Sequence, residues 1–406
     1  MRSAFVTDIQ LGPVRDIMAR KVALLTATDL SKVQGSTEAN YVANFLAKSY
    51  DTHIYSPYDP EMTDVTYHEI PDTSVIPALL LYNIVLLPYF LYQNYQQNFD
   101  LFYTYKGFHL TPCITTQLFD CNWITDFQTK PTGQAKEWAS LSNANNIIVR
   151  LYYRLADLMY KLTLSYAKAT ITLSEPIRTE LQETYNVDPA RIQLVPLGVD
   201  SDKFSPERLQ AGDTEPLDMV YLGSISSQRD LGLCIDAVAS ENLKVDVRLH
   251  LVGDGPEDYI DELRRKANEA DISESVCWHG YVDHEEIPAV LAQMDIAISP
   301  LPDHDSYEVS SPAKIFEYLS MGLPILCTDI RAHRNVLSAE QIGFFFQPGS
   351  DSSLVNTINR LSELESEDWL DIQRQAREAG KENDWSARMK LIQEVIEMQT
   401  SQSMDR

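Results

Sequence analysis

The sequence is poor in basic residues. It has 33 lysines and arginines against 59 aspartates and glutamates, which gives a formal net charge of -26 at pH 7. A surface of this sign repels nucleic acid at long range, so we exclude a nucleic-acid partner. The hydrophobic content of 44% and the charged content of 23% are typical of a globular chain. At 406 residues, such a chain is expected to form two domains.

Cysteine is also scarce. The sequence has five cysteines, an odd number, and no two of them form a Cys-x-x-Cys pair. We interpret them as reduced, mostly buried thiols of a cytosolic protein. Residues 1–20 contain charges throughout and no apolar core, so we expect no signal peptide there.

Long hydrophobic runs are few. The most apolar stretch, residues 75–92, approaches the length of a membrane span, but Pro77, Asn83 and Pro88 interrupt it and no basic flank follows. We therefore expect a buried helix or one that touches a membrane surface, and no membrane-spanning helix.

One amphipathic segment, residues 148–168, collects basic residues in this acidic chain. They are Arg150, Arg154, Lys161 and Lys168. Two alternatives are open for this segment and for residues 75–92. Either both pack into the core of the N-terminal half, or they bind a lipid surface. The second alternative predicts a peripheral membrane protein at the cytoplasmic face.

Expected strands and helices alternate along the chain in two blocks. The expected strands lie at residues 21–27, 53–56, 169–173, 192–196, 218–223, 247–252, 276–282, 296–300 and 325–327. Alternation of this kind predicts an α/β protein with two doubly wound parallel sheets, in which ligands bind beyond the carboxyl ends of the strands. We place an acceptor-side domain at 1–200, a second domain at 201–380 beginning with a polar linker, and a final helical segment at 381–406 that packs back on the first domain.

The most informative stretch is residues 308–326. Ser310 and Ser311 are good N-cap residues, Pro312 suits a first helical turn, and Gly322 and Pro324 end the helix.

Within that helix, Lys314 and Glu317 lie three residues apart and share one face. A carboxylate can accept both hydroxyls of a ribose, while a lysine at a helix N-terminus favours a diphosphate. The alternative is an ordinary ion pair on a surface helix.

Several motifs occur in a fixed order along the chain. They are Ile-Thr-Leu-Ser174-Glu, Val-Pro-Leu-Gly198-Val-Asp200-x-x-x-Phe204, Tyr-Leu-Gly223, Leu-Val-Gly253-x-Gly255-Pro256, His-Gly280-Tyr-Val and Ser-Pro312-x-Lys314-x-x-Glu317-Tyr-x-x-x-Gly322-x-Pro324. In this order and spacing they resemble glycosyltransferase family 4, the retaining transferases of the GT-B fold, which have two Rossmann-like domains facing a cleft.

The resemblance implies roles for individual residues. Glu317 matches the glutamate that holds the ribose hydroxyls, and Arg229 matches the basic residue that faces the donor diphosphate. Lys314 would add a second cation. The other positions that the resemblance assigns to donor contacts are Gly35 in the first loop, Gly223 at the end of a strand, main-chain groups at Tyr281 and Val282 for the base, and Ser310 and Ser311.

Two positions depart from the family pattern. The family usually has glutamates eight positions apart, whereas Glu308 precedes Glu317 by nine and Val309 occupies the expected place. Either the loop shifts by one residue and Glu308 acts on the sugar as a catalytic residue, or that role is absent. Ser224 stands where many members have an arginine.

A further segment, Trp123-Ile-Thr-Asp126-Phe-Gln-Thr-Lys-Pro, resembles a loop beside the donor sugar. Asp126 there is either a donor contact or a carboxylate that caps its own loop.

The resemblance implies transfer of a hexosyl-type sugar, with retention, from a nucleotide diphosphate sugar to a hydroxyl of a glycan or a lipid-linked glycan. No Asp-x-Asp pair ends an expected strand, so we expect no metal ion and no cofactor, with Arg229 and Lys314 supplying the positive charge. Two alternatives remain: a sugar-nucleotide epimerase of the same fold, and an inactive partner subunit that binds nucleotide sugar.

Overall fold

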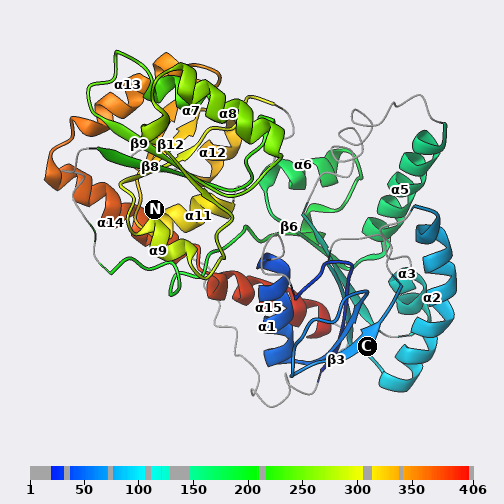
Figure 1. Ribbon diagram of the computed structural model, residues 1–406. Coiled ribbons are helices and arrows are strands. Elements are labelled where there is room, and N and C mark those ends of the chain that lie inside the picture. Colours follow the sequence, from blue (N-terminus) through cyan, green and yellow to red (C-terminus); the bar gives the residue numbers. More distant parts are fainter. Residues whose placement is uncertain are drawn as a thin grey trace. The chain divides into compact units, whose positions relative to one another are not determined.

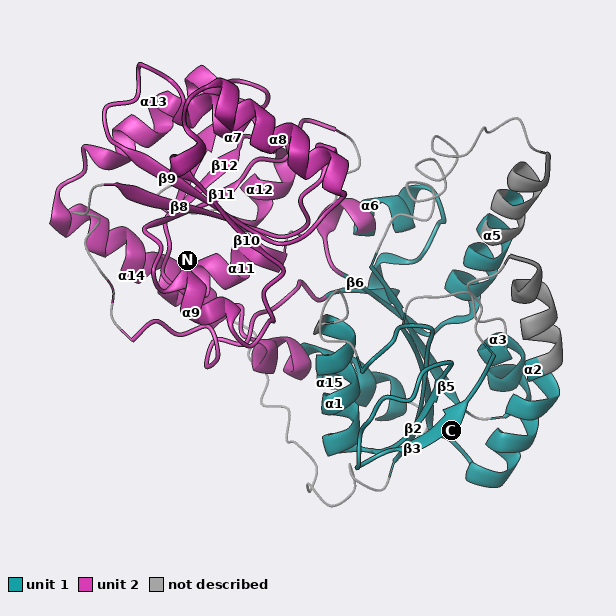
Figure 2. Cartoon of the chain, viewed as in Figure 1, with its two compact units in different colours: residues 1–172, 178–194, 391–406 teal, residues 173–177, 195–390 magenta. Residues whose placement is uncertain are grey.

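The computed structural model describes residues 20–31, 37–71, 76–105, 111–119, 121–128, 147–207, 209, 216–304, 313–337 and 342–401. The chain divides into two compact units (Figure 2). Unit 1 comprises residues 1–172, 178–194 and 391–406, and unit 2 comprises residues 173–177 and 195–390.

Unit 1 contains a parallel sheet of seven strands in the order β3-β2-β1-β4-β5-β6-β7. The strands are β1 Lys21–Thr26, β2 Asp51–Ser56, β3 Thr66–Glu69, β4 Leu101–Tyr105, β5 Asn122–Phe127, β6 Ala169–Thr172 and β7 Ile192–Leu194. The helices are α1 Thr37–Ser49, α2 Ile76–Gln97, α3 Thr111–Leu118, α5 Ile147–Tyr166 and α6 Glu175–Glu183, with the first residues of α6 grouped in unit 2. Figure 1 shows α2, α3 and α5 together beside this sheet.

Unit 2 contains a parallel sheet of six strands in the order β10-β9-β8-β11-β12-β13. The strands are β8 Leu217–Leu222, β9 Val247–Val252, β10 Val276–Gly280, β11 Ile296–Ser299, β12 Ile325–Thr328 and β13 Gly343–Phe346. The helices are α7 Leu231–Val238, α8 Glu257–Glu269, α9 Ile287–Leu291, α11 Ala313–Ser320, α12 Arg331–Val336, α13 Asp351–Ser362 and α14 Ser366–Glu382. Helix α15 Trp385–Ser401 is divided between the units, with its residues up to Lys390 in unit 2 and those from Leu391 onward in unit 1. Short 3₁₀ turns lie at Ser227–Arg229 and Ser273–Ser275 in unit 2 and at Pro189–Arg191 in unit 1. The prediction of two doubly wound parallel sheets is confirmed.

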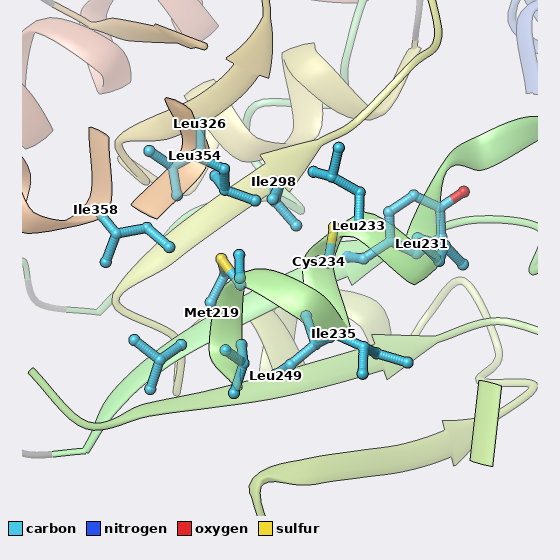
Figure 3. Packing of buried hydrophobic residues seen from close by; sticks show 14 of the residues in the cluster. Met219, Leu231, Leu233, Cys234, Ile235, Leu249, Ile298, Leu326, Leu354 and Ile358 are labelled. Carbon is cyan, nitrogen blue, oxygen red and sulfur yellow. The ribbon is translucent and has the colours of Figure 1, made fainter. Parts of the chain in front are cut away.

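The sheet of unit 2 is buried on both faces by helices. Successive side chains of a strand point to opposite sides, so each strand contributes to two clusters. On β8, Met219 and Tyr221 belong to a cluster with α7, α8 and α13, whereas Val220 belongs to a cluster with α9, α11 and α14. Figure 3 shows the first cluster, in which Cys234 and Ile235 of α7 lie close to Met219. Both clusters consist of hydrophobic side chains, so the two faces of this sheet form the core of the unit.

The chain passes from one unit to the other at positions that differ from our expected domain boundaries. The division falls after Leu194 instead of residue 200, and unit 2 continues to Lys390. Within the expected linker, Phe204 is buried in unit 2, and Arg377 donates hydrogen bonds to the carbonyl oxygens of Ser201 and Phe204. These contacts make residues 201–207 part of the folded unit.

One helix is longer than the sequence-based expectation. Helix α2 continues five residues beyond residue 92, to Gln97, with Pro88 inside it. Within the described parts of the chain, no helix combines the length and the apolar character needed to cross a membrane.

Candidate functional site

The strand order of unit 2 reverses between β8 and β11. From β8 the chain proceeds outward through β9 and β10, then returns to β11 and proceeds outward through β12 and β13 on the other side. The connections therefore leave the carboxyl ends of β8 and β11 in opposite directions, which is where open α/β sheets bind ligands. The residues beyond these two strand ends form the candidate site.

Glycines make a close backbone approach possible at this edge. Gly223 and Gly253, which follow β8 and β9, have φ angles of +131° and +144°. A Cβ atom on Gly253 would lie 2.0 Å from the carbonyl oxygen of Gly223, and one on Gly255 would lie 1.8 Å from the carbonyl oxygen of Ile225. Since no side chain fits in that space, these motif glycines are required for the two turns to pack together.

Helix α11 is fixed to the end of β8 by a tyrosine. The backbone N–H of Leu222 donates a 2.7 Å hydrogen bond to Tyr318 Oη, and burial holds the pKa of Tyr318 well above its usual value. Lys314 lies one helical turn before Tyr318, so the same face of α11 carries it to the end of β8. At the other end of α11, Gly322 adopts a φ of +74° and ends the helix, as predicted.

Lys314 is an ammonium group held in an apolar setting. Its Nζ atom is buried, lies 3.9 Å from the centre of the Tyr221 ring, and has no hydrogen-bond partner among the described residues. A Cβ atom on Gly223 would be 3.3 Å from this Nζ. Burial, followed by the nearby charge of Arg229, lowers the pKa of Lys314 from 10.5 to about 7. A buried ammonium beside a second cation is an arrangement that an anion would stabilise.

Arg229, the second cation, closes the short 3₁₀ turn Ser227–Arg229 that follows β8. The structure thus brings three of the predicted site residues together at one strand end: Gly223, Arg229 and Lys314. Among the described residues, no group of three or more His, Cys, Asp or Glu side chains has the geometry of a metal site.

Glu317 makes a contact that the sequence did not indicate. Its Oε1 lies 3.2 Å from Nε2 of His284, and Nδ1 of His284 lies 2.9 Å from Nζ of Lys203. Both partners were missed because the contacts join residues 33 and 81 positions apart, with no local pattern.

Tyr281 and Val282 directly follow β10, on the same carboxyl edge of the sheet. The N–H of Gly253 donates to the carbonyl oxygen of Gly280 over 2.8 Å, which joins this edge to the glycine turns. Tyr281 is exposed and Val282 is half-buried. Their main-chain groups are therefore at the edge that also carries Gly223.

The sequence predicts a loop around Asp126, but the structure places this residue elsewhere. It belongs to strand β5 of unit 1 and is buried, so the interpretation as a loop-capping residue is wrong. Tyr103 donates a 2.8 Å hydrogen bond to Asp126 Oδ2, and Gln128 Nε2 donates to Oδ1 over 3.3 Å. The buried Glu38 accepts a hydrogen bond from Tyr105 in the same region. Two buried carboxylates thus lie near the point where the strand order of unit 1 reverses, between β1 and β4.

A buried histidine on α12 was also missed. His333 Nδ1 donates to the carbonyl oxygen of Thr328 over 2.8 Å, which leaves Nε2 to accept from Ser299 Oγ over 3.0 Å. Burial lowers the pKa of His333 to about 4. Because Ser299 is buried too, we interpret the pair as a link between the ends of β11 and β12.

Four predicted site residues lie outside the described residues. They are Gly35, Glu308, Ser310 and Ser311.

Two family models match the chain. The model described as "Glycosyltransferase Family 4" matches residues 39–203, and the one described as "Glycosyl transferases group 1" matches residues 216–363.

Similar curated proteins carry transferase names. A putative teichuronic acid biosynthesis glycosyltransferase of Bacillus subtilis (strain 168), TuaH, is 22% identical over 57% of this chain and 55% of its own. The UDP-Gal:alpha-D-GlcNAc-diphosphoundecaprenol alpha-1,3-galactosyltransferase of Escherichia coli is 25% identical over 51% of this chain and 55% of its own. The match to this chain thus spans about half the length of these curated relatives.

Solved structures share the fold over nearly the whole chain. A glycosyltransferase from Rickettsia africae ESF-5 has a TM-score of 0.71 at 16% identity, covering 94% of this chain and 98% of its own. Anabaena HepE in complex with UDP has a TM-score of 0.70 at 16% identity, covering 93% and 100%. With its motifs, its two parallel sheets and these matches, the chain belongs to glycosyltransferase family 4 and has the GT-B fold.

Proposed function

We propose that the chain transfers a sugar from a nucleotide diphosphate sugar to a hydroxyl acceptor, with retention of anomeric configuration. The observation that carries this proposal is the buried Lys314 ammonium, which has no hydrogen-bond partner among the described residues and lies near Arg229. A diphosphate at the end of β8 would supply the missing negative charge. HepE, a similar structure, was solved with UDP and with UDP-glucose, which supports a donor of this class.

In the proposed complex, Glu317 accepts hydrogen bonds from the ribose hydroxyls, and main-chain groups at Tyr281 and Val282 contact the base. The bond between the anomeric carbon and the diphosphate oxygen breaks, and negative charge collects on the departing nucleoside diphosphate. Arg229 and Lys314 stabilise that charge, so their contribution is larger in the transition state than in the bound donor. The acceptor oxygen bonds to the anomeric carbon and its proton is released. In this mechanism the protein itself supplies the positive charge, with no metal ion and no cofactor.

The reaction is tested with a panel of sugar nucleotides, measuring release of nucleoside diphosphate with and without glycan and undecaprenyl-diphosphate-linked acceptors. A transferase releases diphosphate in an acceptor-dependent manner and yields a product with the anomeric configuration of the donor. Conversion of the donor sugar without release would identify an epimerase, and donor binding with neither outcome would identify a binding subunit. Either of these results contradicts the proposal.

We further propose that unit 1 binds the acceptor at a membrane surface. Helices α2, α3 and α5 expose large apolar side chains, among them Tyr95 of α2 at 73% and Leu118 of α3 at 65% exposure. Arg154 and Lys161 of α5 are exposed as well. The E. coli relative is named for a lipid-linked substrate, which supports an acceptor of that kind.

This contact would be peripheral and reversible. Each basic residue near an anionic surface contributes about 1 kcal/mol, so salt is expected to weaken binding. Flotation with vesicles of phosphatidylethanolamine and phosphatidylglycerol tests this point. An absence of binding at every lipid ratio would leave only the interpretation that residues 75–92 and 148–168 pack into the core of the N-terminal half.

A further inference from the structure

Three side chains from separate segments of unit 2 form a hydrogen-bonded row that ends at Glu317. Lys203 lies 2.9 Å from His284 Nδ1, and His284 Nε2 lies 3.2 Å from Glu317 Oε1. Lys203 comes from residues 201–207, His284 from the loop after β10, and Glu317 from α11. The row therefore connects three segments that meet at the carboxyl edge of the sheet.

The chemistry of the end groups determines the protonation of the histidine between them. A lysine ammonium can only donate hydrogen bonds, so Nδ1 of His284 must accept. The ring proton then resides on Nε2, which donates to the carboxylate of Glu317. Both contacts of the ring are thus satisfied by the neutral tautomer with the proton on Nε2.

The row is sheltered from solvent. The side chains of Lys203, His284 and Glu317 are 17%, 15% and 17% exposed. The ring of the buried Phe204 packs against His284 with its centre 5.4 Å from the imidazole centre. A second carboxylate, Glu285, also pairs with Lys203 at 2.7 Å, but its side chain is 79% exposed. Hydrogen bonds in the sheltered part constrain orientation more strongly than the pair at the surface.

We propose that His284, itself held by Lys203, is the positioning residue for Glu317. The hydrogen bond to Oε1 fixes the plane of the carboxylate and leaves Oε2, which has no hydrogen bond among the described residues, to accept from a ribose. His284 lies two positions after Val282. The loop proposed to contact the base therefore also sets the orientation of the Glu317 carboxylate that accepts from the ribose. This inference rests on the proposed role of Glu317 in holding the donor ribose.

Two substitutions of His284 separate positioning from packing. In His284→Gln, the side-chain amide nitrogen can reach the position of Nε2 and donate to Glu317. In His284→Asn, the shorter side chain can replace Nδ1 toward Lys203 but does not reach Glu317. The matched control is Glu285→Gln, which changes a partner of Lys203 that does not contact Glu317.

The measurement is ribose discrimination in calorimetric binding. The probe is whichever of UDP, ADP or GDP binds the wild-type chain most tightly, paired with its 2′,3′-dideoxy analogue. The ratio is the dissociation constant of the dideoxy analogue divided by that of the nucleoside diphosphate, and it reports only the interaction with the hydroxyls. Loss of a hydrogen bond to a charged group is expected to lower this ratio roughly ten- to hundredfold in His284→Asn. The ratio is expected to stay near the wild-type value in His284→Gln and Glu285→Gln.

Binding of the dideoxy analogue also monitors the integrity of the site, because it does not depend on the ribose contact. If His284→Asn does not fold, Lys203→Met supplies the test, since it frees Nδ1 to take the ring proton and should lower the ratio in part. An unchanged ratio in the folded His284→Asn or Lys203→Met variant, or an equal loss of affinity for both ligands, would overturn the positioning role.

Glu317→Ala distinguishes failure of this inference from failure of the proposed function. Loss of discrimination in Glu317→Ala together with full discrimination in His284→Asn would refute positioning and leave the ribose contact in place. Full discrimination in Glu317→Ala would refute the ribose contact itself, and the positioning role with it.

Discussion

Replacing Lys314 with methionine is expected to stabilise the ligand-free protein while removing its activity. Methionine has nearly the length of lysine and no charge, so it can fill the space above the Tyr221 ring. The Nζ atom that it removes is buried and has no hydrogen-bond partner among the described residues. The substitution thus relieves the cost of burying an ammonium and also removes a cation proposed to stabilise the leaving diphosphate.

The pKa of Lys314 gives the magnitude of the expected change in unfolding free energy and the direction of its pH dependence. A fall from 10.5 to about 7 on folding corresponds to a penalty of at most about 5 kcal/mol, at about 1.4 kcal/mol for each tenfold change in proton affinity. Because the pKa is lower in the folded state, the unfolded chain binds more protons between pH 7 and pH 10.5. The penalty is therefore complete below pH 7, decreases as the pH rises, and is absent above pH 10.5.

The assay is urea denaturation of wild type and Lys314→Met at pH 6 and pH 9.5, with nucleoside diphosphate release measured in parallel. The variant should be more stable than wild type at pH 6, and the difference should decrease at pH 9.5. Lys390→Met, at an exposed position of the same unit, is the matched control and should change stability little. A Lys314→Met variant that is less stable than wild type at pH 6 would refute the reasoning, because Nζ would then have a partner that stabilises its charge.

Three further predictions concern other positions. Arg229→Ala is expected to lower kcat about a hundredfold while EDTA changes little, and strict dependence on a divalent cation in the rate assay would contradict this. Glu317→Ala should lower kcat/KM for the donor strongly without loss of the circular-dichroism spectrum, and near-normal turnover of the folded variant would exclude Glu317 as the ribose contact. Tyr103→Phe removes the 2.8 Å hydrogen bond to the buried Asp126 and should cost about 1–3 kcal/mol in urea denaturation, whereas an unchanged midpoint would mean that Asp126 finds another donor.

The fold of unit 2 could be predicted closely because its signals are local. Each strand of the pattern from Asp218 to Cys327 is a short apolar run. Glycine or proline marks the end of the first four, and Pro324 precedes the last. The positions of Gly223 and Gly253 were informative because their φ angles and contacts admit no side chain.

In unit 1 the same method missed strands. Strands β4 and β5 are buried at every residue, so neither shows the alternation that marks a half-exposed strand. Asp126 was assigned to a loop because its segment resembles a loop of the family. Its place in a fully buried strand is exceptional for a carboxylate and requires partners such as Tyr103, which lies 23 positions away. Long-range hydrogen bonds of this kind leave no trace in the local pattern. The same reason explains why no local pattern indicated the contact of His284 with Glu317.

The division of α15 between the units has a consequence for synthesis of the protein. The second half of this helix packs in unit 1, where Ile392 and Ile396 are buried and Thr400 accepts a hydrogen bond from Arg20. Residues 195–390 of unit 2 are translated before these residues, which takes roughly 10–40 s at about 5–20 residues per second. During that interval the nascent unit 1 lacks one of its helices and exposes the apolar surface that α15 later covers. Unit 2 can therefore acquire its core while unit 1 is still incomplete on the ribosome, which makes unit 1 the part of the chain that a chaperone would protect longest.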